Sequence, residues 1–138
     1  MGYTSFFKYM ANRHLDGHDA LVSRNFVFPL PIFVKDRVSV IKTEESFLVL
    51  LAEYRSTLEL AGVVRTDIRE ISAHCHQADG ISISLEKQFY NINDTACASC
   101  EMTYYATLAD DRLKLHMVEY TDIKAPMPLD QMSIFRTG

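Results

Sequence analysis

The sequence predicts an α+β fold in which a layer of helices covers one face of a strongly curved, mostly antiparallel sheet. Apolar residues recur with helical spacing over roughly the first 60 residues, around a Phe-Pro-Leu-Pro connector, and alternate with period two over most of the remainder. A chain of 138 residues fits one domain with a hydrophobic core of its own. We therefore expect a single domain over 1–138, with a body over about 5–122 and an apolar C-terminal tail over 123–138 that packs on the body or on a second subunit.

Three segments in the first half have the spacing of amphipathic helices. Thr4–His14 places its large apolar residues on one face, and a short second helix is predicted at His18–Val22. A long third helix is predicted over 44–61, where apolar residues recur every three or four positions. Thr43 is its expected N-cap, and Gly62 is expected in the left-handed conformation after its end.

Prolines interrupt the strand-forming residues of the connector. Phe26–Phe28 and Ile32–Val34 are predicted as short strand pieces, which Pro29 and Pro31 would confine to a sheet edge or a bend. After a turn, Val38–Ile41 is predicted as a further strand. The connector therefore supplies short strands ahead of the long helix.

The period-two alternation beyond the long helix predicts four strands separated by turns. The strands are expected at about 63–78, 81–90, 96–108 and 113–122. Two-residue turns would fix which residues face each other across neighbouring strands, and they are expected at Asp79-Gly80, Asn93-Asp94 and Asp110-Asp111. These registers pair His76 with Ile83, His74 with Leu85, Ile83 with Tyr104, Leu85 with Met102, Tyr104 with Met117, and Met102 with Glu119.

The predicted registers place ionisable side chains on the same face as the apolar ones. Such groups need partners or water, so they predict either a structural network or a wet pocket. In the pocket interpretation His74 or His76 acts as a general base, while a tyrosine such as Tyr104 polarises a carbonyl and Glu119 orients the imidazole. In the structural interpretation these residues only satisfy one another or face water. The side chains expected to line a pocket are Tyr9, His14, Phe28, Tyr54, Ile83, Leu85, Lys87, Met102 and Met117.

Composition and cysteine spacing argue against other classes of function. A net charge of −4 with 14 basic residues does not suit sequence-independent nucleic-acid binding. The N-terminus lacks a signal-like apolar region and no stretch approaches the ~20 apolar residues of a spanning helix, so we expect a cytoplasmic protein with no membrane partner. Cys97 and Cys100 would point to opposite faces of a strand, and Cys75 away from its neighbouring histidines, so we expect no metal and no other cofactor.

The order of helix, short helix, strand pair, long helix and four-strand meander resembles the nuclear transport factor 2-like superfamily, which includes SnoaL-like polyketide cyclases and steroid delta-isomerases. Local similarities are His18–Val22 running into Phe26–Pro29, and Asp79-Gly80 within the meander. The resemblance implies a cone-shaped α+β barrel with a small-molecule cavity, often dimeric through the outer face of the sheet. Where the steroid isomerase pattern has its general-base aspartate, this chain has Phe28–Pro31, and Tyr9 corresponds loosely to the oxyanion tyrosine.

We therefore expect a protein that binds a small, largely apolar ligand and forms a homodimer, with dehydratase, isomerase or cyclase chemistry as an option. The alternative is a non-catalytic association module with a filled interior. A pocket of about 300 Å³ or more that reaches both His74 and His76 would favour ligand chemistry, whereas an interior filled by side chains would favour the module.

Overall fold

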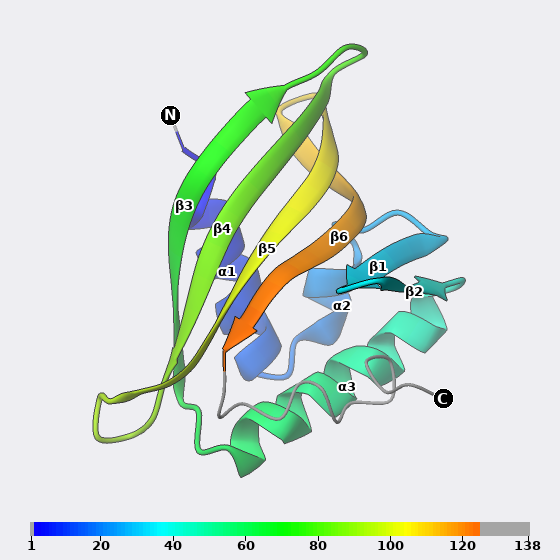
Figure 1. Ribbon diagram of the computed structural model, residues 1–138. Helices are drawn as coiled ribbons and strands as arrows, with labels where there is room; N and C mark the ends of the chain where they lie inside the picture. The colour runs from blue at the N-terminus through cyan, green and yellow to red at the C-terminus, as the bar shows by residue number, and fades with distance from the viewer. Residues whose placement is uncertain (1, 125–138) are drawn as a thin grey trace.

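The chain folds as an α+β cone, in which helices cover one face of a curved sheet (Figure 1). A computed structural model describes residues 2–124, and the predicted packing of the tail lies outside these residues. The helices are α1 (Thr4–Leu15), α2 (Asp19–Ser23) and α3 (Glu44–Leu60), and the strands are β1 (Leu30–Val34), β2 (Arg37–Ile41), β3 (Arg65–Cys75), β4 (Gly80–Tyr90), β5 (Ala96–Ala109) and β6 (Arg112–Lys124). This architecture confirms the predicted fold class.

The six strands of the described sheet lie in the order β2-β1-β6-β5-β4-β3. Neighbouring strands are antiparallel except for β1 and β6, which are parallel. In Figure 1 the four long strands, β3 to β6, curve around α1, and α3 runs below β1 and β2. The core lies between the helices and the inner face of the sheet, where Phe7, Leu58, Leu85 and Phe89 are almost fully buried.

Local and long-range contacts define the helix ends. The Thr43 hydroxyl accepts a hydrogen bond from the backbone N–H of Ser46, and Gly62 has a φ of 80°, so both predicted caps of α3 are confirmed. At the start of α1 a residue from the sheet acts instead, because the Glu70 carboxylate accepts from the backbone N–H of Tyr3 at 2.7 Å. An anion at this end also complements the helix dipole.

The predicted strand at Phe26–Phe28 does not form. Phe26 makes an isolated bridge to Leu115, and the Phe28–Pro29 peptide is cis. Pro29 lies in a bend, which was one of the two predicted options, whereas Pro31 lies in β1, and β1 is not an edge strand because it lies between β2 and β6. Pro31 is tolerated there because the pairing with β6 covers only the next three residues, Ile32 to Val34.

The register between β3 and β4 differs from the prediction. The His76 N–H donates to the Gly80 carbonyl at 2.7 Å, which closes a loop over Gln77–Asp79 rather than a turn at Asp79-Gly80. His74 therefore lies opposite Ser82 instead of Leu85. The difference of three positions is odd, and side chains alternate between faces, so it moves the whole end of β3 to the opposite face.

The register between β5 and β4 agrees with the prediction, whereas the register between β5 and β6 agrees only near the turn. Ile83 faces Tyr104 and Leu85 faces Met102, as predicted. The Asp110-Asp111 turn also forms, but a bulge between Tyr105 and Ala106 shifts the later pairs by one residue. Tyr104 therefore faces Val118 and Met102 faces Tyr120, so the side chains of Met117 and Glu119 turn to the outer face.

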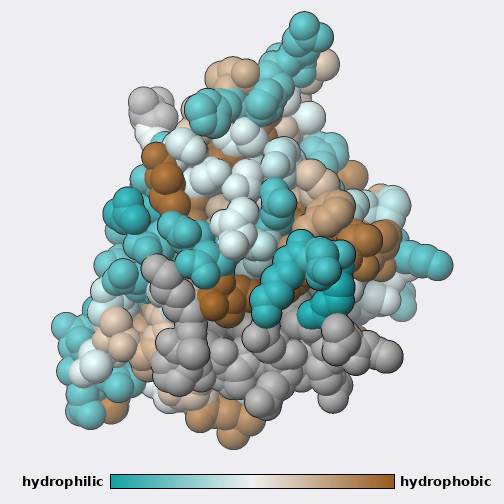
Figure 2. All heavy atoms as spheres, in the orientation of Figure 1, coloured by the Kyte–Doolittle hydropathy of each residue, from teal (hydrophilic) through white to brown (hydrophobic). Residues whose placement is uncertain are grey.

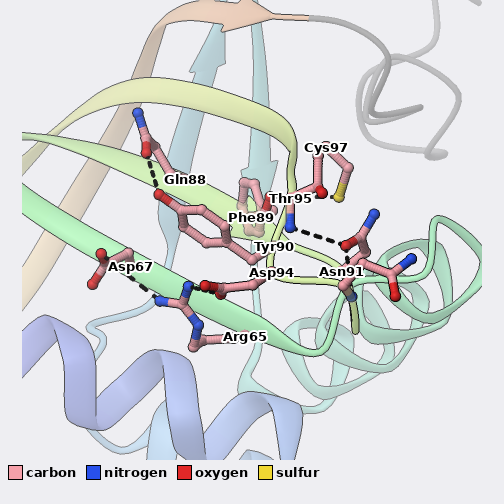
Figure 3. A network of polar contacts seen from close by, with 10 residues as sticks. Arg65, Asp67, Gln88, Phe89, Tyr90, Asn91, Asp94, Thr95 and Cys97 are labelled. Atoms are coloured by element: carbon pink, nitrogen blue, oxygen red, sulfur yellow. Dashed lines mark hydrogen bonds and ion pairs between the residues drawn. The ribbon is translucent and has the colours of Figure 1, made fainter.

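A polar cluster on the outer face holds the β4–β5 loop against β3 (Figure 3). The Arg65 guanidinium lies 4.1 Å from the centroid of the Tyr90 ring and pairs with Asp94 in the loop. The Tyr90 hydroxyl donates to Gln88 at 2.6 Å, and the Asn91 side-chain oxygen accepts from the backbone N–H of Thr95 at 3.1 Å. The polar groups of the cluster are hydrogen-bonded or ion-paired with one another, so we interpret the cluster as structural.

Candidate functional site

Helices α1 and α3 and the inner face of the sheet enclose a largely apolar pocket with a cavity of about 80 Å³. Its wall combines aliphatic and aromatic side chains with a few polar groups, which is the usual composition of a small-molecule site. The lining residues are Met10, Ala11, His14, Val22, Phe26, Ile32, Phe47, Leu50, Leu51, Tyr54, Lys87, Tyr104, Val118 and Tyr120.

His14 lies in the pocket wall on the last turn of α1. Its side chain is 6% exposed, and Nε2 is 2.7 Å from the carbonyl oxygen of Leu51 on α3. A carbonyl only accepts, so Nε2 carries a proton and donates it. Burial lowers the pKa of His14 below its ordinary value, so the ring is neutral near pH 7 and Nδ1 is an acceptor. The ring also stacks on Tyr54, with centroids 5.0 Å apart.

Three tyrosine hydroxyls belong to the residues around the same pocket. Burial raises the pKa of Tyr54 and of Tyr120 well above the ordinary value, so both hydroxyls keep their protons. The ring of Tyr104 stacks on Phe7, with centroids 4.6 Å apart, which fixes its orientation beneath α1. The tyrosines therefore give an apolar wall several neutral hydrogen-bonding groups.

Lys87 brings a positive charge to the pocket. It lies on β4 between Leu85 and Phe89, which point inward and are almost fully buried. Its Nζ is 3.4 Å from the Tyr104 hydroxyl oxygen and 5.9 Å from the centroid of that ring. After burial, which is the main cause, the charge of Lys87 also lowers the pKa of His14.

The structure brings together four of the side chains predicted from the sequence. His14, Tyr54, Lys87 and Tyr104 all line the pocket. Ile83, Leu85 and Met102 face inward as predicted, but they are packed in the core and are not lining residues. Tyr9 is 43% exposed, and Phe28 packs on Phe47 with ring centroids 5.5 Å apart.

The other predicted residues lie outside the pocket. His74 and His76 are exposed at the end of β3, and the His76 ring contacts the hydroxyl of Ser82 at 2.9 Å. Glu119 accepts a hydrogen bond from the Tyr105 hydroxyl at 3.2 Å on the outer face, where Met117 also lies. The predicted inward placement of these four residues is therefore wrong, because it depended on strand registers that the loop and the bulge alter.

Sequence reasoning missed Val118 and Tyr120 as pocket residues. Both turn inward only because of the bulge in β6, for which the sequence has no glycine or proline signal. Phe47 and Leu51 could have been added, because they share the apolar face of α3 with Tyr54. Met10 could likewise have been paired with His14 from their spacing of four on α1.

The cysteines do not form a metal or thiol-redox centre among residues 2–124. Cys100 is buried, and burial raises the pKa of its thiol to about 11, which keeps it protonated. Cys97 contacts the backbone carbonyl of Phe89, and Cys75 is exposed. No group of three or more His, Cys, Asp or Glu side chains within this range could hold a metal ion.

The fold and the pocket place this chain among α+β cones with a hollow between helices and sheet. It has the nuclear transport factor 2-like fold, as the comparison with solved structures shows. It is similar to Aln2 from a Streptomyces species, with a TM-score of 0.64, 10% identity and 86% of each chain covered. It is also similar to an NTF-2 like protein of unknown function from Shewanella oneidensis, with a TM-score of 0.63, 12% identity, and 86% and 94% of the two chains covered.

A third similar structure is a putative calcium/calmodulin dependent protein kinase II association domain from Xanthomonas campestris. Its TM-score is 0.58 at 8% identity, and the match covers 86% of this chain and 83% of that one. No protein-family model matches the chain, and the search of curated proteins gave no match either. Within residues 2–124, no helix is both long and apolar enough to cross a membrane.

Proposed function

We propose that this protein binds a small, largely apolar molecule in the pocket between α1, α3 and the sheet. The observation that carries the proposal is the composition of the wall, in which apolar side chains are combined with five residues that carry polar groups: His14, Tyr54, Lys87, Tyr104 and Tyr120. Apolar walls supply binding energy, and a few fixed polar groups orient the ligand. The nuclear transport factor 2-like fold is compatible with this proposal, although a fold alone does not determine function.

The cavity volume restricts the ligand. About 80 Å³ is well below the ~300 Å³ of a pocket that encloses a drug-sized molecule, and below the ~150 Å³ of a cavity known to hold benzene. The part of the ligand that the cavity encloses is therefore smaller than a benzene ring, as a short aliphatic group would be. We propose binding without a reaction through His74 and His76, because both side chains lie outside this cavity.

Filling the pocket from α3 tests the proposal. Leu50 lines the pocket, whereas its neighbour Val49 is 71% exposed. We expect branched four- to six-carbon amides, alcohols and carboxylates to shift the methyl resonances of Met10, Val22 and Ile32 in NMR titrations. The variant Leu50→Trp should abolish the shifts, and the matched control Val49→Trp should keep them. Unchanged methyl resonances in the wild-type protein across the whole panel would refute the proposal.

A non-catalytic association module is the second candidate. Val38 and Val40 on β2 are each about half exposed, at 51% and 50%, and their pairing with Phe33 and Pro31 places them on the outer face. In Figure 2 apolar atoms gather over β1 and β2 at the right of the view. The cavity also fails both conditions stated above for ligand chemistry, because it is smaller than about 300 Å³ and reaches neither His74 nor His76. A stable dimer that binds no member of the ligand panel would favour the module.

A further inference from the structure

The residues that line the pocket carry a single formal charge. Lys87 is the one basic side chain in that wall, and no aspartate or glutamate belongs to it. His14 is neutral near pH 7 because burial lowers its pKa, and Tyr54 and Tyr120 are neutral because burial raises theirs. Within the described part of the chain, the pocket is therefore positively charged and apolar at once.

The described contacts of Lys87 leave its charge uncompensated. Its Nζ donates to the Tyr104 hydroxyl at 3.4 Å, which is the long end of the hydrogen-bond range. An ammonium has three donor hydrogens, and no carboxylate within residues 2–124 lies in ion-pair contact with it. A half-buried ammonium beside apolar side chains is costly without an anionic or hydrogen-bonding partner.

Tyr104 adds a second donor next to the ammonium. Its oxygen accepts from Lys87, so its own O–H proton stays available for another acceptor. The Tyr104 ring is held by stacking on Phe7, and Lys87 lies on β4 between the buried, inward-facing residues Leu85 and Phe89. Two donors thus lie side by side in the wall of a largely apolar cavity. A carboxylate, which has two acceptor oxygens and one negative charge, matches this arrangement.

We propose that the ligand of this pocket is a small organic carboxylate, with its anionic group at Lys87 and Tyr104 and its hydrocarbon part against the apolar wall. This inference depends on the proposed function, since it names the ligand class of the same pocket. A neutral molecule of the same shape could accept a hydrogen bond from Lys87 but would leave its positive charge without a counter-charge in the complex.

Two probes of matched shape test the inference in the wild-type protein. Isovalerate and isovaleramide have the same branched skeleton and differ in the charge of the polar group. We expect isovalerate to bind at least about tenfold more tightly near pH 7, in NMR titrations followed at the Met10 and Val22 methyl groups. Equal or tighter binding of isovaleramide would overturn the carboxylate inference and leave the proposed function standing. If neither probe binds, the carboxylate inference fails, whereas the proposed function fails only if the whole ligand panel also leaves the methyl resonances unchanged.

Variants then assign the preference to a residue. Lys87→Met keeps the length and apolar stem of the side chain and removes the charge, and we expect it to weaken isovalerate binding about tenfold or more while isovaleramide binding is kept. The control Lys8→Met removes an exposed lysine on α1 and should leave both affinities unchanged. If Lys87→Met retains the isovalerate preference, the ammonium is not the anion site. The wild-type comparison stands alone if the variant does not fold.

Discussion

His14 shows how burial changes the role of a single side chain. Its Nε2–H is committed to the Leu51 carbonyl, which joins α1 to α3, and the surrounding apolar residues disfavour the charged ring. The side chains of His74 and His76 are exposed to solvent, and the His76 ring contacts the Ser82 hydroxyl rather than a helix carbonyl. The chemical character of a histidine therefore follows from its position in the fold rather than from its presence in the sequence.

The lowered pKa of His14 predicts a pH-dependent stability. The unfolded chain has a histidine pKa of about 6.5, and the folded chain has a lower value, so unfolding takes up a proton when the pH lies between the two. The free energy of unfolding should therefore fall as the pH decreases below about 6.5. Above that pH, the titration of His14 should add no pH dependence to it. His14→Gln keeps a donor for Leu51 and removes the titration.

Urea unfolding near pH 5 and near pH 7 measures this effect. We expect the difference in unfolding free energy between the two pH values to be smaller in His14→Gln than in the wild-type protein. The control His18→Gln alters an exposed histidine before α2 and should preserve the wild-type difference. An identical pH dependence in His14→Gln and the wild-type protein would contradict the prediction.

At the scale of elements, one ion pair and one hydrogen bond, both made by Arg55, join the helices around the pocket. Arg55 of α3 donates to the Asp19 carboxylate of α2 at 2.6 Å and to the backbone carbonyl of His14 in α1 at 3.2 Å. Both charged side chains are mostly buried, with 20% and 16% exposure. A single guanidinium nitrogen, Nη1, donates both hydrogen bonds, so Arg55 connects all three described helices.

Replacing this arginine should destabilise the helix layer. Arg55→Lys keeps the charge but shortens the side chain by one bond, so the ammonium cannot hold both acceptors at the distances that Nη1 does, and we expect a loss of about 1–2 kcal/mol in the free energy of unfolding. The matched substitution Arg69→Lys affects a pair with Glu86 in which the Arg69 side chain is 65% exposed, and it should cost less than about 0.5 kcal/mol. Equal losses in the two variants would show that the Arg55 contacts do not stabilise the fold.

The elements themselves were predictable where local chemistry determines them. Thr43 and Gly62 bracket α3 because a cap and a left-handed residue act within one turn, and the Asp110-Asp111 turn is equally local. The β3 register was not predictable, because it depends on whether the left-handed residues are Asp79 and Gly80 or, as observed, Ala78 and Asp79. The bulge near Tyr105 has no local signal either, and it bends the strand as well as shifting its register.

At the scale of the whole molecule, the outer face of β1 and β2 remains our proposed dimer surface. Phe33, Val38 and Val40 lie on this face, and half of each valine is exposed. Exposed apolar patches of this kind often mark contacts between protein chains. The homodimer predicted from the sequence is therefore assigned to this part of the sheet as a proposal.

A charge on β2 tests the dimer. We expect light scattering with size-exclusion chromatography to give a dimer for the wild-type protein and a monomer for Val40→Glu, because a buried carboxylate without a partner opposes association. Leu60→Glu places the same charge at the end of α3, where the residue is 90% exposed, and should leave the dimer intact. A monomeric wild-type protein, or a dimer that persists in Val40→Glu, would refute this assignment.

The sequence by itself determined the fold class, the three helices with the caps of α3, and the inward orientation of Lys87 and Tyr104 on the central strands. Periodicity and capping act over a few residues, so they can be read without coordinates. The tertiary structure decided which polar residues meet: it excluded His74, His76 and Glu119 and added Tyr120. The physical reason is the two-residue period of a strand, because one loop of different length or one bulge exchanges its inner and outer faces.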